Sequence, residues 1–460
     1  MTKSTGRRKE ITIETKRTTK ILSRRTIVLR PDPSLEAAID EDAAAAEIEL
    51  LTDKPETHKE KTTMIRLIKL AVTVLITLAA ATATYAAWGD RDFTFGYEGV
   101  THDPETTNCT PLNVALQPDG RFLITGFRTT ALGKRIFLRR YLENGLPDLS
   151  FGQNGWAQSS ASTSAFVHYE GERIVVMNSG KIAVFGVAGG QHAVWMYNAN
   201  GTSDNAFGTN GRATLSVSTN LARSGIQAAG TNLLLLFSGS ASGELLMLNP
   251  SGTPQTRWGN AGSVSTGLVG TQRMYRESST GKILVAGRIS GLQKLRVKRF
   301  MSNGTADSTF IQYEIGSDEQ GYGEWISIEA SHLLPLPNEG VLLSYSGIIQ
   351  GPGHPSFTPH YYKTISVSGS ETGGGHIGWA FGNFGAIRSD GKFVTSSDSE
   401  GRFWRKSYFA QLNDLEGTPV GMFDGWNLSA SIVPAVILPD DRVLVVGKTS
   451  VIAMARLTAN

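Results

Sequence analysis

The chain has 460 residues, of which 51 are glycine and 18% are charged, and its formal net charge is +3. Many glycines and few charges favour short strands joined by tight turns over a helical protein. The small net charge, and the lack of a Lys/Arg run interleaved with aromatics after residue 88, exclude an extended nucleic-acid-binding face. We therefore expect an all-β protein with no nucleic-acid partner.

Residues 1–63 carry opposite charges in their two halves. Ten Lys and Arg lie within residues 1–30, and ten Asp and Glu lie within residues 31–60. Blocks of like charge seldom pack, so we expect a charged, mostly disordered tail, with a weak helix after Ser34 as the alternative. A translation start at Met64 would remove this tail.

Residues 64–87 have the pattern of a signal sequence. Arg66 and Lys69 precede an uncharged stretch from Leu70 to Ala87, and small residues offer cleavage positions near Ala83 and Ala87. The segment is a signal peptide or, if uncleaved, a signal anchor, and it is the one membrane contact that we expect. Both alternatives make residues 88–460 extracytoplasmic: secreted or periplasmic, or anchored with this domain outside.

A short motif, DxxFG, recurs along residues 88–460. Its conspicuous residues are Asp92, Phe95 and Gly96; Asp148, Phe151 and Gly152; Asp204, Phe207 and Gly208; and, without the glycine, Asp307 and Phe310. The aspartate can cap a turn, the phenylalanine can be buried between repeats, and the glycine can adopt a positive φ, so we expect a structural role.

Metal binding is the functional alternative for this motif. Calcium needs six to eight oxygen ligands, whereas each copy offers one carboxylate, so we expect no metal or other cofactor. Arg140, Arg299 and Arg456 stand at matching places near the end of the third strand, and the first two stand eight residues before the repeated aspartate. This recurrence favours an ion pair or a backbone contact over a ligand site. The single cysteine, Cys109, has no cation beside it in the sequence and is expected to be inert.

The repeated unit predicts a β-propeller. A turn followed by a β-rich run, such as PDGRFLITG at 118–126 and SGKIAVFG at 179–186, occurs seven times, about every 53 residues, within units that suit four strands. The last unit ends without a DxxFG segment, whereas Asp92 to Gly99 precedes the first unit. We therefore expect a seven-bladed propeller, closed by pairing this N-terminal strand segment with the C-terminal blade.

The sequences of the units resemble those of the delta-60 repeat β-propellers of secreted bacterial proteins. The resemblance rests on QPDGRFLITG with LRRYLENGLPDLSFGQNG, and on SGKIAVFG with WMYNANGTSDNAFGTNG, and it extends over residues 88–460. It departs at Gln255–Gly259, which lack the aspartate, and in the fifth and sixth units. The resemblance implies an extracytoplasmic propeller and no particular activity.

Function in propellers usually lies where loops break the repeat. The richest departures are residues 313–333 and 347–363, and the candidate binding residues in them are Glu319, Glu324, Trp325, His354, His360 and Tyr361. The acidic residues would suit glycoside hydrolysis, and His354, His360 and His376 would suit a metal if the loops converge, but neither set has a diagnostic spacing. Ordinary solvated loops are the alternative, and no catalytic residue is assigned.

These patterns favour a binding or scaffold module over an enzyme and leave enzymatic activity open. The expected partner is a glycan or a protein of the cell envelope. A secreted glycan-acting hydrolase or lyase on a propeller scaffold is one alternative, and a membrane-anchored sensor is the other.

Overall fold

The computed structural model divides into two units, Met1–Tyr85 and Ala86–Asn460. The residues that it describes are 11–12, 26–27, 92–157, 169–316, 324–336, 340–350, 359–378, 382–389, 392–397, 405–411, 419–424, 435–448 and 450–458. In the first unit, β1 (Ile11–Thr12) pairs with β2 (Thr26–Ile27). Within the described residues no helix is long and apolar enough to cross a membrane. The predicted signal or anchor segment at 64–87 lies outside them.

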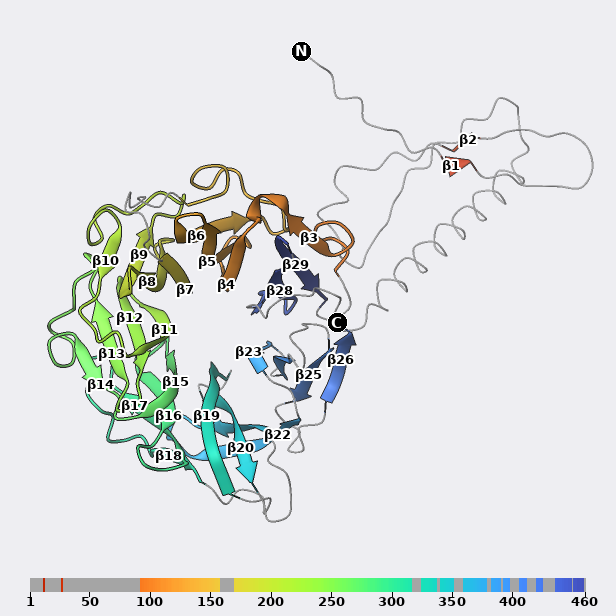
Figure 1. Ribbon diagram of the computed structural model, residues 1–460. Helices are drawn as coiled ribbons and strands as arrows, with labels where there is room; N and C mark the ends of the chain where they lie inside the picture. Colours follow the sequence, from red (N-terminus) through yellow and green to blue (C-terminus); the bar gives the residue numbers. More distant parts are fainter. Residues whose placement is uncertain are drawn as a thin grey trace, which may run out of the picture. The chain divides into compact units, whose positions relative to one another are not determined.

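The second unit consists of antiparallel sheets that follow one another along the chain (Figure 1). Sheet 1 contains β4 (Cys109–Leu116), β5 (Phe122–Thr130) and β6 (Gly133–Tyr141); sheet 2 contains β7 (Tyr169–Val176), β8 (Ile182–Ala188), β9 (Gln191–Tyr197) and β10 (Arg212–Thr214). Sheet 3 contains β11 (Ala222–Ala229), β12 (Asn232–Ser238), β13 (Glu244–Leu248) and β14 (Ser263–Ser265); sheet 4 contains β15 (Val269–Arg276), β16 (Ile283–Arg288), β17 (Leu295–Phe300) and β18 (Tyr313–Ile315).

The remaining sheets have four strands each. Sheet 5 contains β19 (Glu324–Pro335), β20 (Val341–Gln350), β21 (His360–Ile365) and β22 (Glu371–Gly378); sheet 6 contains β23 (Gly382–Ile387), β24 (Lys392–Ser397), β25 (Arg405–Gln411) and β26 (Pro419–Asp424). Sheet 7 contains β27 (Ala435–Ile437), β28 (Val443–Lys448), β29 (Ile452–Leu457) and β3 (Val100–Asp103). The expected all-β architecture of four-stranded antiparallel sheets is confirmed, and a 3-10 turn, η1 (Pro104–Thr106), follows β3.

The second strands of sheets 1 to 5 are strongly apolar, because both of their faces are covered. In β12, the five residues Leu233 to Phe237 are all buried. A strand with one face in water would alternate between apolar and polar residues instead. The turns that precede these strands contain glycines with positive φ, such as Gly120 at 80° and Gly180 at 79°. This conformation favours glycine and fixes where each second strand begins.

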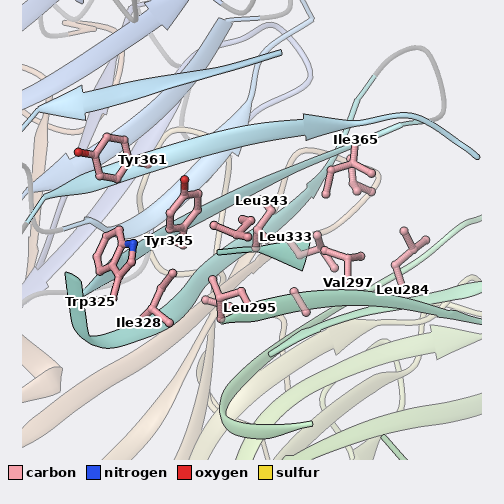
Figure 2. Close-up of a cluster of buried hydrophobic side chains, with 14 of the residues drawn as sticks. Leu284, Leu295, Val297, Trp325, Ile328, Leu333, Leu343, Tyr345, Tyr361 and Ile365 are labelled. Atoms are coloured by element: carbon pink, nitrogen blue, oxygen red, sulfur yellow. The ribbon is translucent and has the colours of Figure 1, made fainter. Parts of the chain in front are cut away.

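The hydrophobic cores lie between neighbouring sheets. One core joins sheets 4 and 5, and in it Leu295 and Val297 face Leu333 and Leu343 (Figure 2). The first strands of the sheets, which are β4, β7, β11, β15, β19, β23 and β27, each contact the first strand of the next sheet, and β27 also contacts β4. Neighbouring sheets are therefore in contact along their first strands, and sheet 7 is in contact with sheet 1.

Sheet 7 is made from two distant parts of the chain. β3 pairs antiparallel with β29, with Val100 opposite Ala455 and Asp103 opposite Ile452 (Figure 1). The N-terminal strand thus supplies the outer strand of the sheet that the C-terminal residues begin. A core of Phe95, Phe122 and Met454, among others, fills the space between sheets 7 and 1.

Candidate functional site

The DxxFG motif forms a tight turn whose aspartate binds the backbone two residues further on. Oδ1 of Asp92 accepts a hydrogen bond from the amide of Thr94 at 3.0 Å. The same bond joins Asp148 to Ser150, Asp204 to Ala206 and Asp307 to Thr309. The four phenylalanines are at most 4% exposed. The glycines of the three complete copies have φ between 55° and 57°, a conformation that residues with a Cβ rarely adopt.

Each motif also docks on a turn of the next sheet. The amide of the motif's last glycine donates to a carbonyl there at 2.7–2.9 Å, in the pairs Gly96–Asn144, Gly152–Asn200, Gly208–Ser251 and Gly259–Asn303. A glycine of the receiving turn makes room for the aromatic ring, since a Cβ on Gly145 would stand 2.5 Å from Cζ of Phe95. We call this set of contacts the motif clamp. It recurs from junction to junction, and its Gly96 copy joins sheet 7 to sheet 1.

Arginines of the third strands strengthen the clamp. Nε of Arg140, Arg299 and Arg456 donates to the motif aspartate at 2.9, 2.8 and 2.7 Å, respectively. Nη1 of each donates to a backbone carbonyl of the next sheet, at Ala199, Val367 and Glu143. The ion pair predicted from the sequence spacing is confirmed for Arg140 and Arg299. The guanidinium group therefore ties the motif to both sheets at once.

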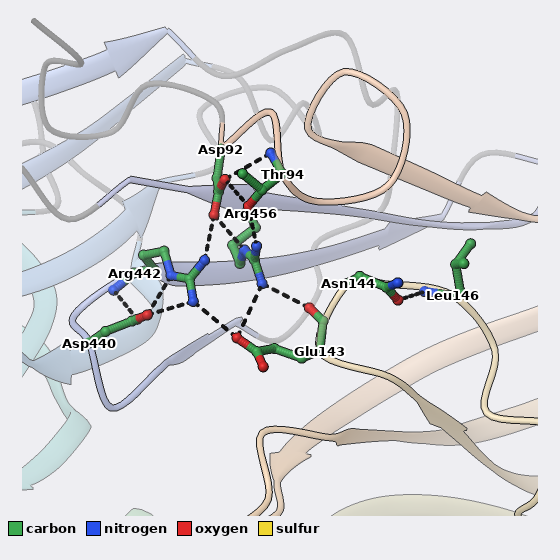
Figure 3. Close-up of polar contacts among 8 residues, drawn as sticks. All are labelled: Asp92, Thr94, Glu143, Asn144, Leu146, Asp440, Arg442 and Arg456. Atoms are coloured by element: carbon green, nitrogen blue, oxygen red, sulfur yellow. Dashed lines mark hydrogen bonds and ion pairs between the residues drawn. The ribbon is translucent and has the colours of Figure 1, made fainter. Parts of the chain in front are cut away.

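At the junction of sheets 7 and 1 the clamp contains a network of charges (Figure 3). Oδ2 of Asp92 accepts from Arg442 and from Arg456, both at 2.7 Å. Burial by itself would raise the pKa of Asp92, but hydrogen bonds from Thr94 and Arg442 and the charge of Arg456 lower it to about 2. Asp92 is thus ionised at neutral pH and binds two cations.

A cavity of about 430 Å³ opens beside this network. Its lining residues are Asp119, Arg121, Leu142, Glu143, Asn144 and Arg456. Several of them belong to the clamp: Arg456 and Glu143 bind each other through the Glu143 carbonyl, and Arg121 forms an ion pair with Asp148 at 3.1 Å. Because these contacts recur at other junctions, we assign this cavity to the joint between the sheets.

A second cleft, of about 320 Å³, occurs at the same junction, and two of its lining residues, Glu105 and Trp156, break the repeat. Its lining residues are Glu105, Gln153, Asn154, Trp156 and Ala157, and we call it the Trp156 cleft. The turn FGQNGW that carries the tryptophan is a copy of the repeat, in which the corresponding residues are Val100, Arg212 and Ser263. Glu105 comes from η1, the turn that follows β3. The cleft therefore combines an acidic residue of sheet 7 with polar and aromatic residues of sheet 1.

A buried arginine contacts two of the residues that line the Trp156 cleft. The Arg139 side chain is fully buried, and its Cζ lies 4.3 Å from the ring centre of Trp156. Its Nε donates to Asp103 Oδ2 at 2.5 Å, and its Nη2 forms an ion pair with Glu105 Oε2 at 2.9 Å. The hydroxyl of Tyr141 also donates to Asp103, at 2.8 Å, and burial, followed by the charge of Asp103, raises the pKa of this tyrosine. These contacts fix the orientation of the indole and of Glu105.

The Trp156 cleft has the side chains that proteins use to bind sugars. An indole offers an apolar face for C–H groups, and the carboxylate and amide side chains of Glu105, Gln153 and Asn154 can bond hydroxyl groups. Trp156 is half-buried, and Glu105, Gln153 and Asn154 are exposed. Arg139 forms ion pairs with both Asp103 and Glu105. The cleft therefore has fixed hydrogen-bonding groups beside an aromatic face.

The residues singled out from the sequence do not gather at this cleft. Trp325 and Tyr361 are 5% and 6% exposed and pack with Tyr345 in the core between sheets 4 and 5 (Figure 2). The ring centres of Trp325 and Tyr361 are 6.1 Å apart and nearly perpendicular. His360 is 7% exposed and begins β21. These aromatic side chains contribute to packing and present little surface to a ligand.

The other candidates have less defined positions. Glu324 begins β19, with its backbone opposite Gln350, and Glu319 and His354 lie outside the described residues. The segment 313–333, expected as a loop, contains the strand β18 and most of β19. Its alternation of Trp325, Ile328 and Ala330 with polar residues is interrupted by β-bulges, which hides the period of a strand.

The described residues contain no group of three His, Cys, Asp or Glu side chains that could hold a metal ion. Cys109 is fully buried, and burial raises the pKa of its thiol to about 11. A thiol of this kind stays protonated near neutral pH and is a poor nucleophile.

Comparisons with known proteins bear on the fold. Residues 278–310, which include Arg299, Asp307 and Phe310 of one clamp, match a family model described as a domain of unknown function (DUF5122) beta-propeller. No curated protein matches the chain. Solved structures that are similar include the Dos1 propeller, with 11% identity over 78% of this chain and 94% of that chain and a TM-score of 0.47.

Two further similar structures are the Nup133 β-propeller domain of Vanderwaltozyma polyspora and the polysaccharide lyase Uly1. The first is 11% identical over 78% of this chain and 97% of that chain, with a TM-score of 0.44. The second is 11% identical over 76% of this chain and 90% of that chain, with a TM-score of 0.45.

Proposed function

We propose that residues 88–460 form an extracytoplasmic propeller that binds a glycan of the cell envelope in the Trp156 cleft. The observation that carries the proposal is that this cleft joins the indole of Trp156 and the carboxylate of Glu105, at positions where other copies of the repeat have different residues, to the amides of Gln153 and Asn154. Residues that hold every junction together have a structural task. Residues that occur at one junction only are free to serve a ligand.

The proposed scaffold is a closed ring of seven blades. Its support is the pairing of β3 with β29, the contact of β27 with β4, and the Gly96 clamp between sheets 7 and 1, which has the geometry of the other clamps. Closure would cover the sheet edges that an open stack leaves exposed. It would also fix Glu105 relative to Trp156, since the two residues come from different sheets.

The proposed location rests on the sequence of residues 64–87, with its basic flank, uncharged stretch and small residues. N-terminal sequencing of the protein from the cell envelope or the medium tests this part. A new N-terminus between Ala83 and Trp88 supports a cleaved signal peptide. An intact segment in the membrane fraction supports the anchored form, and protein found only inside the cell contradicts both.

A glycan array tests the binding function directly. We expect the purified protein to bind a subset of envelope polysaccharides, and Trp156→Ala to weaken that binding by about tenfold or more, because an aromatic contact with its buried area is worth more than about 1.4 kcal/mol. Tyr97→Ala is the matched control, since Tyr97 is an aromatic residue of the preceding turn and is 80% exposed. Equal binding by the two variants, or no binding by the unaltered protein, would contradict the proposal.

A further inference from the structure

Four large apolar side chains are exposed on the turns at the junction of sheets 7 and 1. Tyr97, Phe93, Leu149 and Leu146 are 80%, 70%, 63% and 52% exposed, respectively. Among the described residues, the first three are the most exposed large apolar side chains. Single apolar residues are common on protein surfaces, whereas a group of them marks an interaction site. We call these four residues the apolar rim patch.

A backbone contact of the motif clamp brings two of these side chains to neighbouring positions. The amide of Gly96 donates to the carbonyl of Asn144 at 2.9 Å. Tyr97 directly follows Gly96, and Leu146 is the second residue after Asn144. The amide of Leu146 also donates to Oδ1 of Asn144, at 3.1 Å. Tyr97 and Leu146 therefore lie on two turns that are bonded to each other.

A single guanidinium group ties the other end of the motif to the same turn. Nη2 of Arg456 donates to Oγ1 of Thr94, and its Nη1 donates to the carbonyl of Glu143, both at 2.8 Å (Figure 3). Phe93 precedes Thr94 in the motif. Leu149 follows the Glu143 turn, at the place that Phe93 has in the preceding copy of the motif. The four apolar side chains thus belong to one cluster of bonded turns.

The clamp itself does not require apolar residues at these positions. The copies of the repeat in sheets 2 to 4 form the same clamp contacts with polar residues there. The corresponding residues are Asn205, Thr256 and Ser308 for Phe93 and Leu149; Thr202, Thr253 and Thr305 for Leu146; and Thr209, Asn260 and Gln312 for Tyr97. The apolar side chains at the junction of sheets 7 and 1 therefore serve something other than the clamp.

The charged groups beside the patch indicate which partner it fits. Nε of Arg121 lies 3.1 Å from Oδ2 of Asp148, and Arg442 and Arg456 are both paired with Asp92 at 2.7 Å. These cations are neutralised by carboxylates of the protein, so they do not favour an anionic partner. The interaction that the patch offers is burial of its apolar side chains.

The sequence places the patch close to the predicted membrane segment. Ala87, the last residue of the uncharged stretch, is five residues before Asp92. An extended chain of that length reaches at most about 18 Å. In the anchored form, the motif that carries Phe93 and Tyr97 therefore begins near the lipid surface. Aromatic residues are enriched at this interface, and apolar side chains of surface-bound segments enter it by about 5–10 Å.

We propose that the apolar rim patch docks on the outer surface of the lipid bilayer in the membrane-anchored form of the protein. Phe93, Tyr97, Leu146 and Leu149 enter the headgroup region, and the turns that carry the motifs face the membrane. The short connection to the membrane segment raises the effective concentration of the patch at the bilayer, so that a few side chains are sufficient for docking. The proposal rests on the anchored form and is independent of glycan binding in the Trp156 cleft.

A spin label tests the docking in the full chain. The single cysteine, Cys109, is fully buried, so a thiol-reactive label attaches only to an introduced cysteine. We place it with Leu149→Cys, reconstitute the chain in phosphatidylcholine vesicles, and compare its collisions with oxygen, which concentrates in lipid, and with a water-soluble nickel chelate. We expect the ratio of oxygen to nickel collisions to rise several-fold when vesicles are present.

Leu292→Cys is the matched control. Leu292 is 49% exposed and lies in the turn between β16 and β17, at the end of its sheet opposite to the motif turns. Its label should stay accessible to nickel. Phe93→Asn/Tyr97→Thr gives the motif the residues of the sheet 2 copy, and both replaced side chains are exposed. This double variant should keep its Tm but return the label at position 149 to the nickel chelate.

Each result decides the proposal. A chain that floats with vesicles while the labels at positions 149 and 292 meet nickel equally is anchored but not docked, which refutes the patch. A chain that does not associate with vesicles refutes the anchored form and the docking with it. Shielding that persists in the double variant would show that other residues dock. Shielding without vesicles that increases with protein concentration would identify a second copy as the partner and overturn the proposal.

Discussion

The junction of sheets 7 and 1 contains two sets of polar side chains with different origins. The motif clamp around Asp92 and Arg456 repeats contacts that other junctions also make. The Trp156 cleft is built on Arg139, where the corresponding residues of later repeats are Trp195, Leu246 and Lys298. Positions with the same residues in several repeats hold the sheets together in this protein. Positions whose residues differ from those of the other repeats are available for a ligand.

The largest expected effect is on stability, from the buried ring of the clamp. Phe95→Ala should lower the free energy of unfolding by about 3–5 kcal/mol, because it removes a fully buried aromatic side chain and leaves a cavity. Phe93→Ala is the matched control, since Phe93 lies in the same motif and is 70% exposed, and its effect should stay within about 0.5 kcal/mol. Denaturant unfolding measures both. Similar losses in the two variants would mean that the clamp does not hold the junction.

Alanine substitutions at two glycines distinguish the effect of backbone strain on stability from the effect of packing in the clamp. Gly145 and Gly190 have φ of +86° and +83°, so alanine at either position is strained by about 1–2 kcal/mol. A Cβ at Gly190 meets nothing within 4 Å, whereas a Cβ at Gly145 would collide with Phe95. We expect Gly145→Ala to destabilise the protein by about 1–3 kcal/mol more than Gly190→Ala, as overpacking does. Equal effects would show that the turn and the ring do not touch.

Acid should weaken the clamp through Asp92. Its pKa is about 2 in the folded protein and 3.8 without these partners. Its stabilising contribution is therefore present above pH 3.8 and is lost as the pH falls towards 2, and it amounts to about 2 kcal/mol. We expect the difference in unfolding free energy between the unaltered protein and Asp92→Asn to shrink over this range.

Urea unfolding at several pH values between 5 and 2 measures this difference. Glu98→Gln, which removes an exposed carboxylate of the same segment, controls for the loss of one charge. A difference for Asp92→Asn that is constant with pH would mean that the arginines do not hold Asp92 ionised.

The parts of the fold that depend on residues close in the chain could be predicted from the sequence. Turn glycines, apolar runs and the DxxFG spacing predict the strands and the ion pair of Arg140 with Asp148, because each depends on residues close in the chain. Trp325 and Tyr361 are predicted in loops because the fifth unit departs from the repeat. The sequence alone does not distinguish an aromatic residue of the core from one of a binding site. The departure there reflects bulged strands.

The Trp156 cleft was not predicted from the sequence, because it lies in a copy that agrees closely with the repeat. Trp156 differs from the corresponding residues of the other copies, but its neighbours in the sequence match them. A position-by-position comparison of FGQNGW with FGYEGV and FGTNGR would have revealed the tryptophan. Its contact with Arg139, and the contact of Arg139 with Asp103, join separate strands, and no local pattern reports them.

The smallest expected effect on stability belongs to Glu105, and it gives the most direct test of the proposed function. Glu105 has a side chain that is 56% exposed, and Arg139 keeps Asp103 as a partner without it. Glu105→Gln should therefore change the unfolding free energy by less than about 0.5 kcal/mol. Isothermal titration of this variant with the polysaccharide that binds best on the array should give an affinity at least about tenfold weaker than that of the unaltered protein, because a charged hydrogen-bond acceptor is lost. Unchanged affinity with unchanged stability would contradict the assignment of the Trp156 cleft as the binding site.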